Sequence, residues 1–237
     1  GIAFRLAEAG ASVIVADINL EVACETVGEL KAAGYKAKAV QSDTSKVADA
    51  EKTVKEAISA FGDLHILVNN AGIFPMAPAI EMTEAMWDKT IDINLKGVMF
   101  FSQAAARAMI AKGHGGKIVN IASVDAFHPT GNLAEYDASK GGMVMLTKAL
   151  AKEWASKGIN VNAIAPGAIK TPGAAAGLTG LSKEQAEAAI KAFVATIPMG
   201  RQGVPDDVAM VALFLATEAS DYITGTTIVT DGGYLVG

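Results

Sequence analysis

Cysteine is almost absent from this chain of 237 residues, since Cys24 is the only one. A single cysteine forms no internal disulfide and offers no pair of thiolate ligands to a metal ion. The three histidines, His65, His114 and His128, are scattered along the sequence and show no metal-ligand spacing. We therefore expect no metal site from the sequence.

The sequence also lacks a basic cluster, and its formal net charge is −5. Nucleic-acid binding needs clustered Lys and Arg, so we expect no nucleic-acid partner. No apolar run approaches the roughly 20 residues of a membrane-spanning helix, and no signal peptide is visible. We expect no membrane partner and a cytoplasmic location. Hydrophobic residues make up 51% of the chain, which is typical of a folded domain with a sizeable core.

Strand-like and helix-like segments alternate along the whole chain. We expect strands at 12–17, 36–43, 65–71, 117–123, 160–165 and 226–230. We expect helices at 1–10, 20–33, 48–61, 83–112, 133–156, 182–196 and 205–217, with a break or close contact at Gly97. This alternation predicts a single α/β domain over residues 1–237, with a doubly wound parallel sheet in three layers. The irregular region around 166–199 is expected to form a flexible flap over a substrate.

Tyr136 and Lys140 are the most informative residues, and Ser123 lies thirteen positions before Tyr136. Residues four apart share one face of a helix, so the Lys140 ammonium can lie beside the Tyr136 phenol. A fixed positive charge favours the phenolate and lowers the tyrosine pKa, as general acid-base catalysis near neutral pH requires. Ser123 could hold the reacting oxygen. The alternative is a half-buried aromatic residue beside a solvated lysine.

Other motifs accompany this group. They are Asn69-Asn70-Ala71-Gly72, Asn94, Pro166-Gly167, Thr171 and Asp231-Gly232-Gly233. Together with Ser123, Tyr136 and Lys140 they resemble the short-chain dehydrogenase/reductase family over essentially the whole chain. The chain resembles two types of member about equally, the glucose 1-dehydrogenases and the 3-oxoacyl carrier-protein reductases. The resemblance implies a Rossmann-like fold.

The resemblance also implies a catalytic set of four residues, namely Asn94, Ser123, Tyr136 and Lys140. Tyr136 would act as general acid or base, and Lys140 would lower the tyrosine pKa and bind the nicotinamide ribose. Ser123 would donate a hydrogen bond to the carbonyl oxygen. Asn94 would hold a water that relays protons to Lys140; the alternative is an asparagine that caps a kink in its helix.

The implied cofactor is NAD, held by Asp17, Asp43, Thr44, Asn70, Ala71, Gly72, Tyr136, Lys140, Pro166, Gly167, Ile169 and Thr171. Asp17 would accept hydrogen bonds from the adenosine ribose and repel a 2′-phosphate, and Ile18 supplies no compensating cation, so NADP is less expected. Asp17 could instead cap the following helix. Asp43 could simply form a turn.

The sequence departs from the family at its start. Gly1 aligns just after the glycine-rich loop, so the family's first strand and that loop have no counterpart here. We expect that these residues are missing or trimmed. If the protein begins at Gly1, its sheet lacks a central strand and its cofactor affinity falls. No phosphate-binding glycine is assigned.

The function expected from these residues is NAD(H)-dependent hydride transfer between nicotinamide and a secondary alcohol or ketone. The substrate would be a sugar, a polyol, a small hydroxy compound or a 3-oxoacyl thioester. The residues considered for substrate contacts are Met76, Asp125, Phe127, His128, Asn132, Ile169 and 173–178. The alternative is a catalytically silent nucleotide-binding or scaffold protein. By resemblance we expect a homotetramer built through helices 83–112 and 133–156 and the C-terminal strand.

Overall fold

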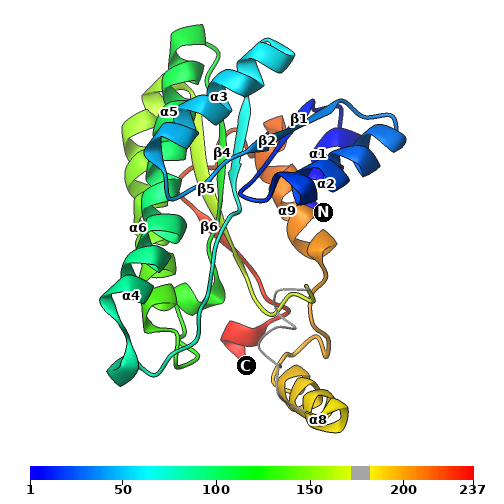
Figure 1. Cartoon of the computed structure of the whole chain (residues 1–237), viewed down its shortest axis with the longest axis vertical. Helices are drawn as coiled ribbons and strands as arrows, with labels where there is room; N and C mark the ends of the chain where they lie inside the picture. Colours follow the sequence, from blue (N-terminus) through cyan, green and yellow to red (C-terminus); the bar gives the residue numbers. More distant parts are fainter. Residues whose placement is uncertain (172–181) are drawn as a thin grey trace.

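The computed structural model describes residues 1–171 and 182–237, which form an α/β fold with helices on both faces of parallel strands (Figure 1). The strands are β1 (Val13–Asp17), β2 (Ala37–Gln41), β3 (Ile66–Asn69), β4 (Gly116–Ile121), β5 (Ile159–Pro166) and β6 (Thr227–Thr230). Every strand pair among them is parallel. The predicted fold class and single domain are confirmed.

The strands fall into two hydrogen-bonded groups. β1 pairs with β2, and a second sheet has the order β3-β4-β5-β6. Within residues 1–171 and 182–237, no ladder joins β1 to β3.

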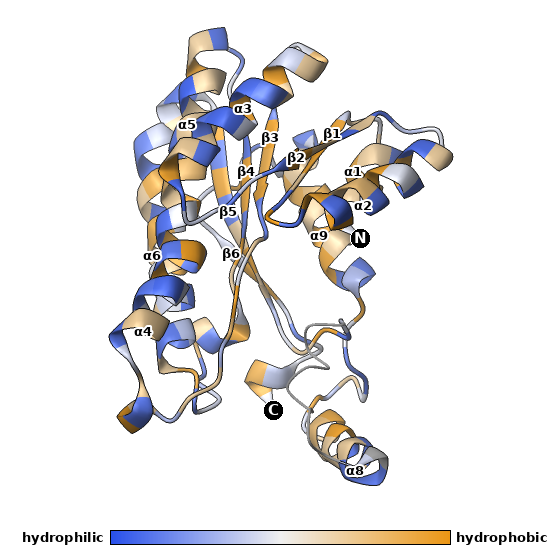
Figure 2. Ribbon diagram, viewed as in Figure 1, coloured by the Kyte–Doolittle hydropathy of each residue, from blue (hydrophilic) through white to orange (hydrophobic). Residues whose placement is uncertain are grey.

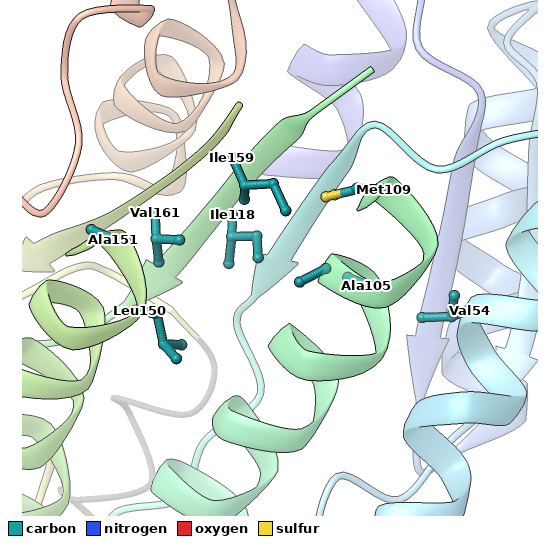
Figure 3. Packing of buried hydrophobic residues seen from close by; sticks show 9 residues of the cluster. Val54, Ala105, Met109, Ile118, Leu150, Ala151, Ile159 and Val161 are labelled. Atoms are coloured by element: carbon teal, nitrogen blue, oxygen red, sulfur yellow. The ribbon is translucent and has the colours of Figure 1, made fainter. Parts of the chain in front are cut away.

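One face of the strands is covered by α3 (Val47–Phe61), α5 (Gly97–Lys112) and α6 (Ala134–Trp154), with α4 (Glu84–Ile91) at one end (Figure 1). Their apolar side chains meet the strands in a dry cluster (Figure 3). Met109, Ile118 and Val161 are fully buried there. This packing fixes the position of α6, which carries Tyr136 and Lys140.

The opposite face is covered by α1 (Ile2–Glu8), α2 (Leu20–Ala32) and α9 (Pro205–Ala216). Val208, Ala212 and Leu215 of α9 pack on Val119 and Ile164 of the four-stranded sheet. Hydrophobic residues are concentrated along the strands in Figure 2, as burial on both faces requires.

Helix α1 connects the two groups of strands. It packs on β2 through the cluster that contains Ala7 and Ala37, and its Ile2 packs on the α9 cluster. The Arg5 guanidinium binds the Asp206 carboxylate with two hydrogen bonds, of 2.6 Å from Nε to Oδ1 and 2.7 Å from Nη2 to Oδ2.

The long helical region predicted at 83–112 is interrupted as expected. A π-helical segment, η2 (Asp92–Lys96), separates α4 from α5. Gly97 follows this segment. A side chain has no room at this position, because a Cβ at Gly97 would lie 2.5 Å from the Thr44 carbonyl oxygen. Single π-helical turns of this kind often occur at functional sites, and this one contains Asn94.

Three predicted strands were too long at their carboxyl ends. The structure ends β2 at Gln41, β3 at Asn69 and β4 at Ile121. The residues that follow leave the sheet as loops, and these are the residues predicted to bind cofactor or substrate. Just past the ends of β2 and β4, the Ser42 and Ala122 N–H groups still donate to the Asp17 and Ile164 carbonyls of the neighbouring strands, at 2.9 and 2.7 Å, before the chain leaves the sheet.

The predicted flap at 166–199 is described only in part, because residues 172–181 lie outside the described residues. Helix α8 (Lys183–Val194) follows and begins with a capping box between Ser182 and Gln185. It lies at the same end of the molecule as α4 and the C-terminus (Figure 1). None of the described helices has both the length and the hydropathy to cross a bilayer.

Candidate active site

The predicted catalytic residues gather beyond the carboxyl ends of β3 and β4. Ser123 follows β4 and is 6% exposed, whereas Tyr136 and Lys140 lie on the first turns of α6. The carboxyl edge of an open parallel sheet is where such folds bind ligands. The four catalytic candidates therefore come from three places in the chain: the loop after β4, the helix α6 and the segment η2.

Tyr136 and Lys140 lie side by side, as their spacing predicts. The Lys140 Nζ is 5.5 Å from the centre of the Tyr136 ring. Lys140 is only 3% exposed, and its Nζ donates a 2.6 Å hydrogen bond to the Ile121 carbonyl at the end of β4. The Ser123 hydroxyl also lies beside the Tyr136 phenol and acts to lower the pKa of that phenol. Ser123, Tyr136 and Lys140 thus surround one small volume.

The expected lowering of the tyrosine pKa is wrong for this state of the protein. The pKa of Tyr136 is raised to about 12, mainly by burial, which outweighs the hydrogen bond from Ser123 and is assisted by the charges of Asp125 and Asp137. Burial also lowers the pKa of Lys140 to about 8, although Asp125 opposes that change. The helical spacing predicts proximity correctly, but desolvation and two carboxylates decide the sign of the tyrosine shift.

Asp125 is more closely involved than the sequence indicated. The Ser123 hydroxyl donates a 2.6 Å hydrogen bond to Asp125 Oδ2, and the Asp125 N–H donates back to Ser123 Oγ at 3.2 Å. Thr130 donates to the other carboxylate oxygen at 3.0 Å. Asp125 therefore orients the Ser123 hydroxyl. The signal in the sequence was its position two residues after a serine that ends a strand.

Asn94 is fully buried and joins two parts of the site. Its carboxamide oxygen accepts a 2.9 Å hydrogen bond from the Ile73 N–H, and its Nδ2 donates to the Ile73 carbonyl at 2.8 Å and to Ser139 Oγ at 3.1 Å. These bonds hold the loop after β3 against α6. They match neither a simple helix cap nor a side chain that points to solvent.

The loop of Asn70, Ala71 and Gly72 is exposed beside this group. A Cβ at Gly72 would lie 3.4 Å from Asn94 Oδ1 and 3.6 Å from Lys140 Nζ. Gly72 therefore faces the buried lysine with no side chain of its own between them, so a ligand can approach the backbone closely.

Asp17 ends β1 at the same edge of the molecule. Its Oδ1 accepts a 2.8 Å hydrogen bond from the Asn19 N–H. The interpretation of Asp17 as a helix cap is wrong, because Asn19 caps α2 by accepting from the Glu21 and Val22 amides.

Asp43 supports a turn. Its Oδ1 accepts hydrogen bonds from the backbone N–H and hydroxyl of Ser45, at 3.0 and 2.6 Å. The hydroxyl bond is the main reason why the pKa of Asp43 is lowered. The turn interpretation accounts for this carboxylate. Thr44, the next residue, is held against Gly97.

Pro166 and Gly167 continue the edge at the end of β5. A Cβ at Gly167 would lie 2.8 Å from the Asp231 Cβ, which explains why glycine is needed at this close approach. Ile169 forms an isolated bridge with Gly203, and its side chain packs on the core. The prediction that the Ile169 side chain closes over a substrate is not supported by this packing. Thr171 is the last described residue before the gap and is exposed.

Several aromatic residues near the site were not predicted. Phe74 meets Tyr136 edge to face, with ring centres 6.0 Å apart. Tyr234 contacts His128 and also Phe193 of α8, so the end of the chain, α8 and the loop after Ser123 lie together. Phe74 follows the Asn-Asn-Ala-Gly motif by two residues, which is a usable signal. Nothing in the sequence indicates the Tyr234 contacts.

The remaining substrate candidates lie on neighbouring loops. The Asn132 carbonyl accepts a hydrogen bond from the Ala77 N–H at 2.9 Å, which joins the loop of Met76 to that of Asn132. Met76 and Phe127 are 60% and 50% exposed, so each has apolar surface available for a ligand. The candidates at 173–178 lie outside the described residues.

Comparisons with known proteins agree with this geometry. Residues 1–235 match the family model described as enoyl-(acyl carrier protein) reductase. A 2-dehydro-3-deoxy-D-gluconate 5-dehydrogenase of Dickeya dadantii is 41% identical over 99% of this chain and 90% of its own length. The chain belongs to the short-chain dehydrogenase/reductase family.

Two further members of the short-chain dehydrogenase/reductase family show the range of similarity. A diacetyl reductase [(S)-acetoin forming] of Staphylococcus epidermidis is 39% identical over 98% of this chain and 92% of its own length. The crystal structure of a gluconate 5-dehydrogenase from Burkholderia cenocepacia J2315, in complex with NADP and tartrate, is 36% identical. It has a TM-score of 0.91 and covers 100% of this chain and 90% of that one.

Proposed function

We propose that this family member is an NAD(H)-dependent oxidoreductase that interconverts a secondary alcohol and a ketone, with Tyr136 as general acid and base. The observation that carries the proposal is the convergence of the Ser123 hydroxyl, the Tyr136 phenol and the buried Lys140 ammonium beyond the ends of β3 and β4. A catalytically silent protein would have no need for a lysine with 3% exposure at this position.

The residues suit reduction of a carbonyl group and its reverse. A bound nicotinamide cofactor supplies or accepts the hydride. Ser123 donates a hydrogen bond to the carbonyl oxygen as negative charge develops there, and Tyr136 gives the proton that makes this oxygen a hydroxyl. In the oxidation direction, Tyr136 takes that proton back. Asp125 holds Ser123 in position until the Ser123 hydroxyl turns its one hydrogen from Asp125 to the carbonyl oxygen, and Asn94 holds the cofactor loop against α6.

Lys140 supports this chemistry in two ways. With its pKa near 8 it is largely cationic at neutral pH, so its Nζ, 5.5 Å from the ring centre, places a positive charge beside the Tyr136 ring. Its closeness to Gly72 also suits binding of the hydroxyl groups of a cofactor ribose. The proton relay through Asn94 is part of the same proposal, with Asn94 in a positioning role.

The residues also fit a dinucleotide along the carboxyl edge. Asp17, Asp43 and Thr44 would border the adenosine. Asn70, Ala71 and Gly72 would line the middle of the cofactor. Pro166, Gly167, Ile169 and Thr171 would adjoin the nicotinamide, with Ile169 acting through its backbone. The open face of Gly72 toward Lys140 supports this arrangement.

The substrate we propose is a polyhydroxy compound such as a sugar acid or polyol. Asp125, His128 and Thr130 place polar groups on the loop beside Ser123, and such groups suit a substrate with several hydroxyls. The Dickeya relative is named for a sugar acid, whereas the Staphylococcus relative is named for a small diketone. A 3-oxoacyl thioester is the runner-up.

The decisive experiment replaces Tyr136 with Phe. We expect Tyr136→Phe to lower kcat by about 10²–10⁴-fold, the usual contribution of a general acid or base, while NADH binding changes little. Tyr222→Phe is the matched control, because it removes a fully exposed phenol hydroxyl far from this group. Turnover is followed at the nicotinamide absorbance with a panel of sugar acids, polyols and hydroxy ketones. Undiminished turnover in Tyr136→Phe would refute the mechanism.

A further inference from the structure

Three potential metal ligands meet at the end of the sheet opposite the active site. Asp63 and His65 lie in the segment that leads from α3 into β3, and His114 lies in the turn between α5 and β4. β3 and β4 are neighbouring parallel strands, with Ile66 opposite Lys117. The segments before them therefore meet at the amino edge, although the residues are far apart in the sequence.

The potential ligand atoms of the three side chains lie close together. A carboxylate oxygen of Asp63 and a nitrogen of each imidazole all lie within 4.8 Å of one another. The His114 Nε2 is 3.1 Å from Asp63 Oδ1, and the two imidazole rings stack with their centres 4.5 Å apart. Ligands of a tetrahedral zinc ion lie roughly 3.3 Å apart when each bond is about 2.0–2.2 Å long. Shifts on the order of 1 Å in exposed side chains would close the site.

His114 is already oriented as a metal ligand is. Its Nδ1 lies 2.6 Å from the Gly115 carbonyl and donates its hydrogen to that oxygen. Nε2 faces Asp63 at 3.1 Å and donates its hydrogen to that carboxylate, and a bound cation would replace this hydrogen. Metal-bound histidines almost always donate their second N–H to a carbonyl or carboxylate in this way. Position 115 requires glycine, because a Cβ there would overlap the Gly158 carbonyl.

An ion-pair network is the simpler account of part of this cluster. Lys112 Nζ lies 3.6 Å from Asp63 Oδ2, and His114 pairs with the same carboxylate. That network explains Asp63, Lys112 and His114, but it involves His65 only through the stacking of its ring on His114. Lys112 is 47% exposed at its side chain, so it can swing away without leaving a buried charge.

We propose that Asp63, His65 and His114 bind one divalent cation of the zinc class, which favours imidazole and carboxylate ligands. Three protein ligands leave coordination positions for water. His114 also lines a surface pocket of about 430 Å³ with Ser156 and Lys157, so solvent has access beside it. The site would tie the segment before β3 to the turn before β4. It is independent of the proposed hydride transfer.

The test is zinc binding to chelator-treated protein that carries no histidine tag. Calorimetry with ZnCl₂ compares the unmodified chain with His65→Ala, His114→Ala and, as the matched control, His128→Ala. The third histidine contacts Tyr234 instead of this cluster. We expect one Zn²⁺ per chain in the unmodified protein and in His128→Ala, and at least about tenfold weaker binding in the other two.

A thermal readout accompanies the titration. Zn²⁺ should raise the Tm of the unmodified chain and of His128→Ala, but not that of His65→Ala or His114→Ala. His65 is exposed, so its substitution removes no core packing, and circular dichroism without metal checks that each variant is folded. Equal zinc affinity in all four proteins, or no binding by the unmodified chain, would overturn the proposal. Turnover enters neither result.

Discussion

At the scale of single residues, charge and burial around Tyr136 oppose each other. Burial and the carboxylates of Asp125 and Asp137 raise the pKa of the phenol, whereas Ser123 lowers it. Burial lowers the pKa of Lys140 to about 8, so Lys140 loses its charge mainly above neutral pH. Alcohol oxidation needs the phenolate, so its rate should rise with pH until Lys140 begins to lose its proton.

The Asp125→Asn variant tests this balance. The amide keeps the shape of the side chain but removes a negative charge that raises the pKa of both Tyr136 and Lys140. The pKa of each group should therefore fall, and the pH profile of alcohol oxidation should move to lower pH by roughly half a unit to one unit. The measurement is kcat/KM against pH.

Asp221→Asn serves as the control for this variant. Asp221 pairs with Lys117 at the start of β4, away from Tyr136. Its pH profile should match that of the unmodified chain. An unshifted profile in Asp125→Asn would mean that Asp125 does not act on the catalytic phenol.

Cofactor choice is also a matter of one residue. We expect NAD to be preferred because the Asp17 carboxylate repels a 2′-phosphate, although the Burkholderia structure is described with NADP. Asp17→Asn should raise the ratio of kcat/KM for NADP to that for NAD by about tenfold or more, which corresponds to about 1.4 kcal/mol. A preference for NADP in the unmodified chain would contradict our assignment.

The identity of the candidate residues was predictable, but their electrostatics were not. The proximity of Tyr136 and Lys140 follows from their spacing, because a helix fixes neighbours four residues apart, and Ser123 was selected by its place after an apolar run and by the family resemblance. The pKa of Tyr136 depends on how deeply α6 is buried and on Asp125, which belongs to another element. Such shifts arise from tertiary packing, so a motif alone cannot supply them.

At the scale of elements, the alternation of strands and helices predicted the architecture well. The boundaries at 12–17 and 20–33 differ from β1 and α2 by one residue at most. The π-helical form of residues 92–96 was not predicted, since only a break at Gly97 was expected. The Thr44 carbonyl, which approaches Gly97 closely, comes from a distant loop, and the sequence does not show this contact.

A pair of glycine substitutions tests this close approach. Gly97→Ala would place a Cβ 2.5 Å from the Thr44 oxygen, so the free energy of unfolding should fall by about 1–3 kcal/mol despite the better helix propensity of alanine. The control is Gly28→Ala in α2, where the added Cβ meets nothing within 4 Å. Its free energy of unfolding should rise by roughly 0.5–1 kcal/mol, because alanine has the better helix propensity.

Urea denaturation measures both glycine variants. NADH affinity should also fall in Gly97→Ala, because Thr44 borders the proposed adenosine site. If the two alanine variants changed stability by equal amounts, the contact between Gly97 and Thr44 would be unimportant.

At the scale of the whole molecule, the outer helical face carries exposed apolar side chains. Trp87 of α4, Ile110 of α5 and Met145 of α6 are 42%, 42% and 63% exposed. These helices cover one side of the sheet (Figure 1). Apolar surface of this kind is typical of a protein interface, and it supports the proposed homotetramer through this face and β6.

Sedimentation of Met145→Glu tests the assembly. A charge at the centre of an apolar interface is costly when it has no partner, so this variant should sediment as a smaller species than the unmodified chain. Met210→Glu is the control, because Met210 is 49% exposed on α9 at the opposite face. A monomeric unmodified chain would contradict the proposed tetramer.

The link through α1 has a consequence for folding cooperativity. α1 packs on β2 and on the α9 cluster, and the Arg5–Asp206 pair beside it lies at the surface, so that pair weakens as salt is added. The contact between α1 and α9 should therefore loosen at a lower temperature at high ionic strength than at low ionic strength.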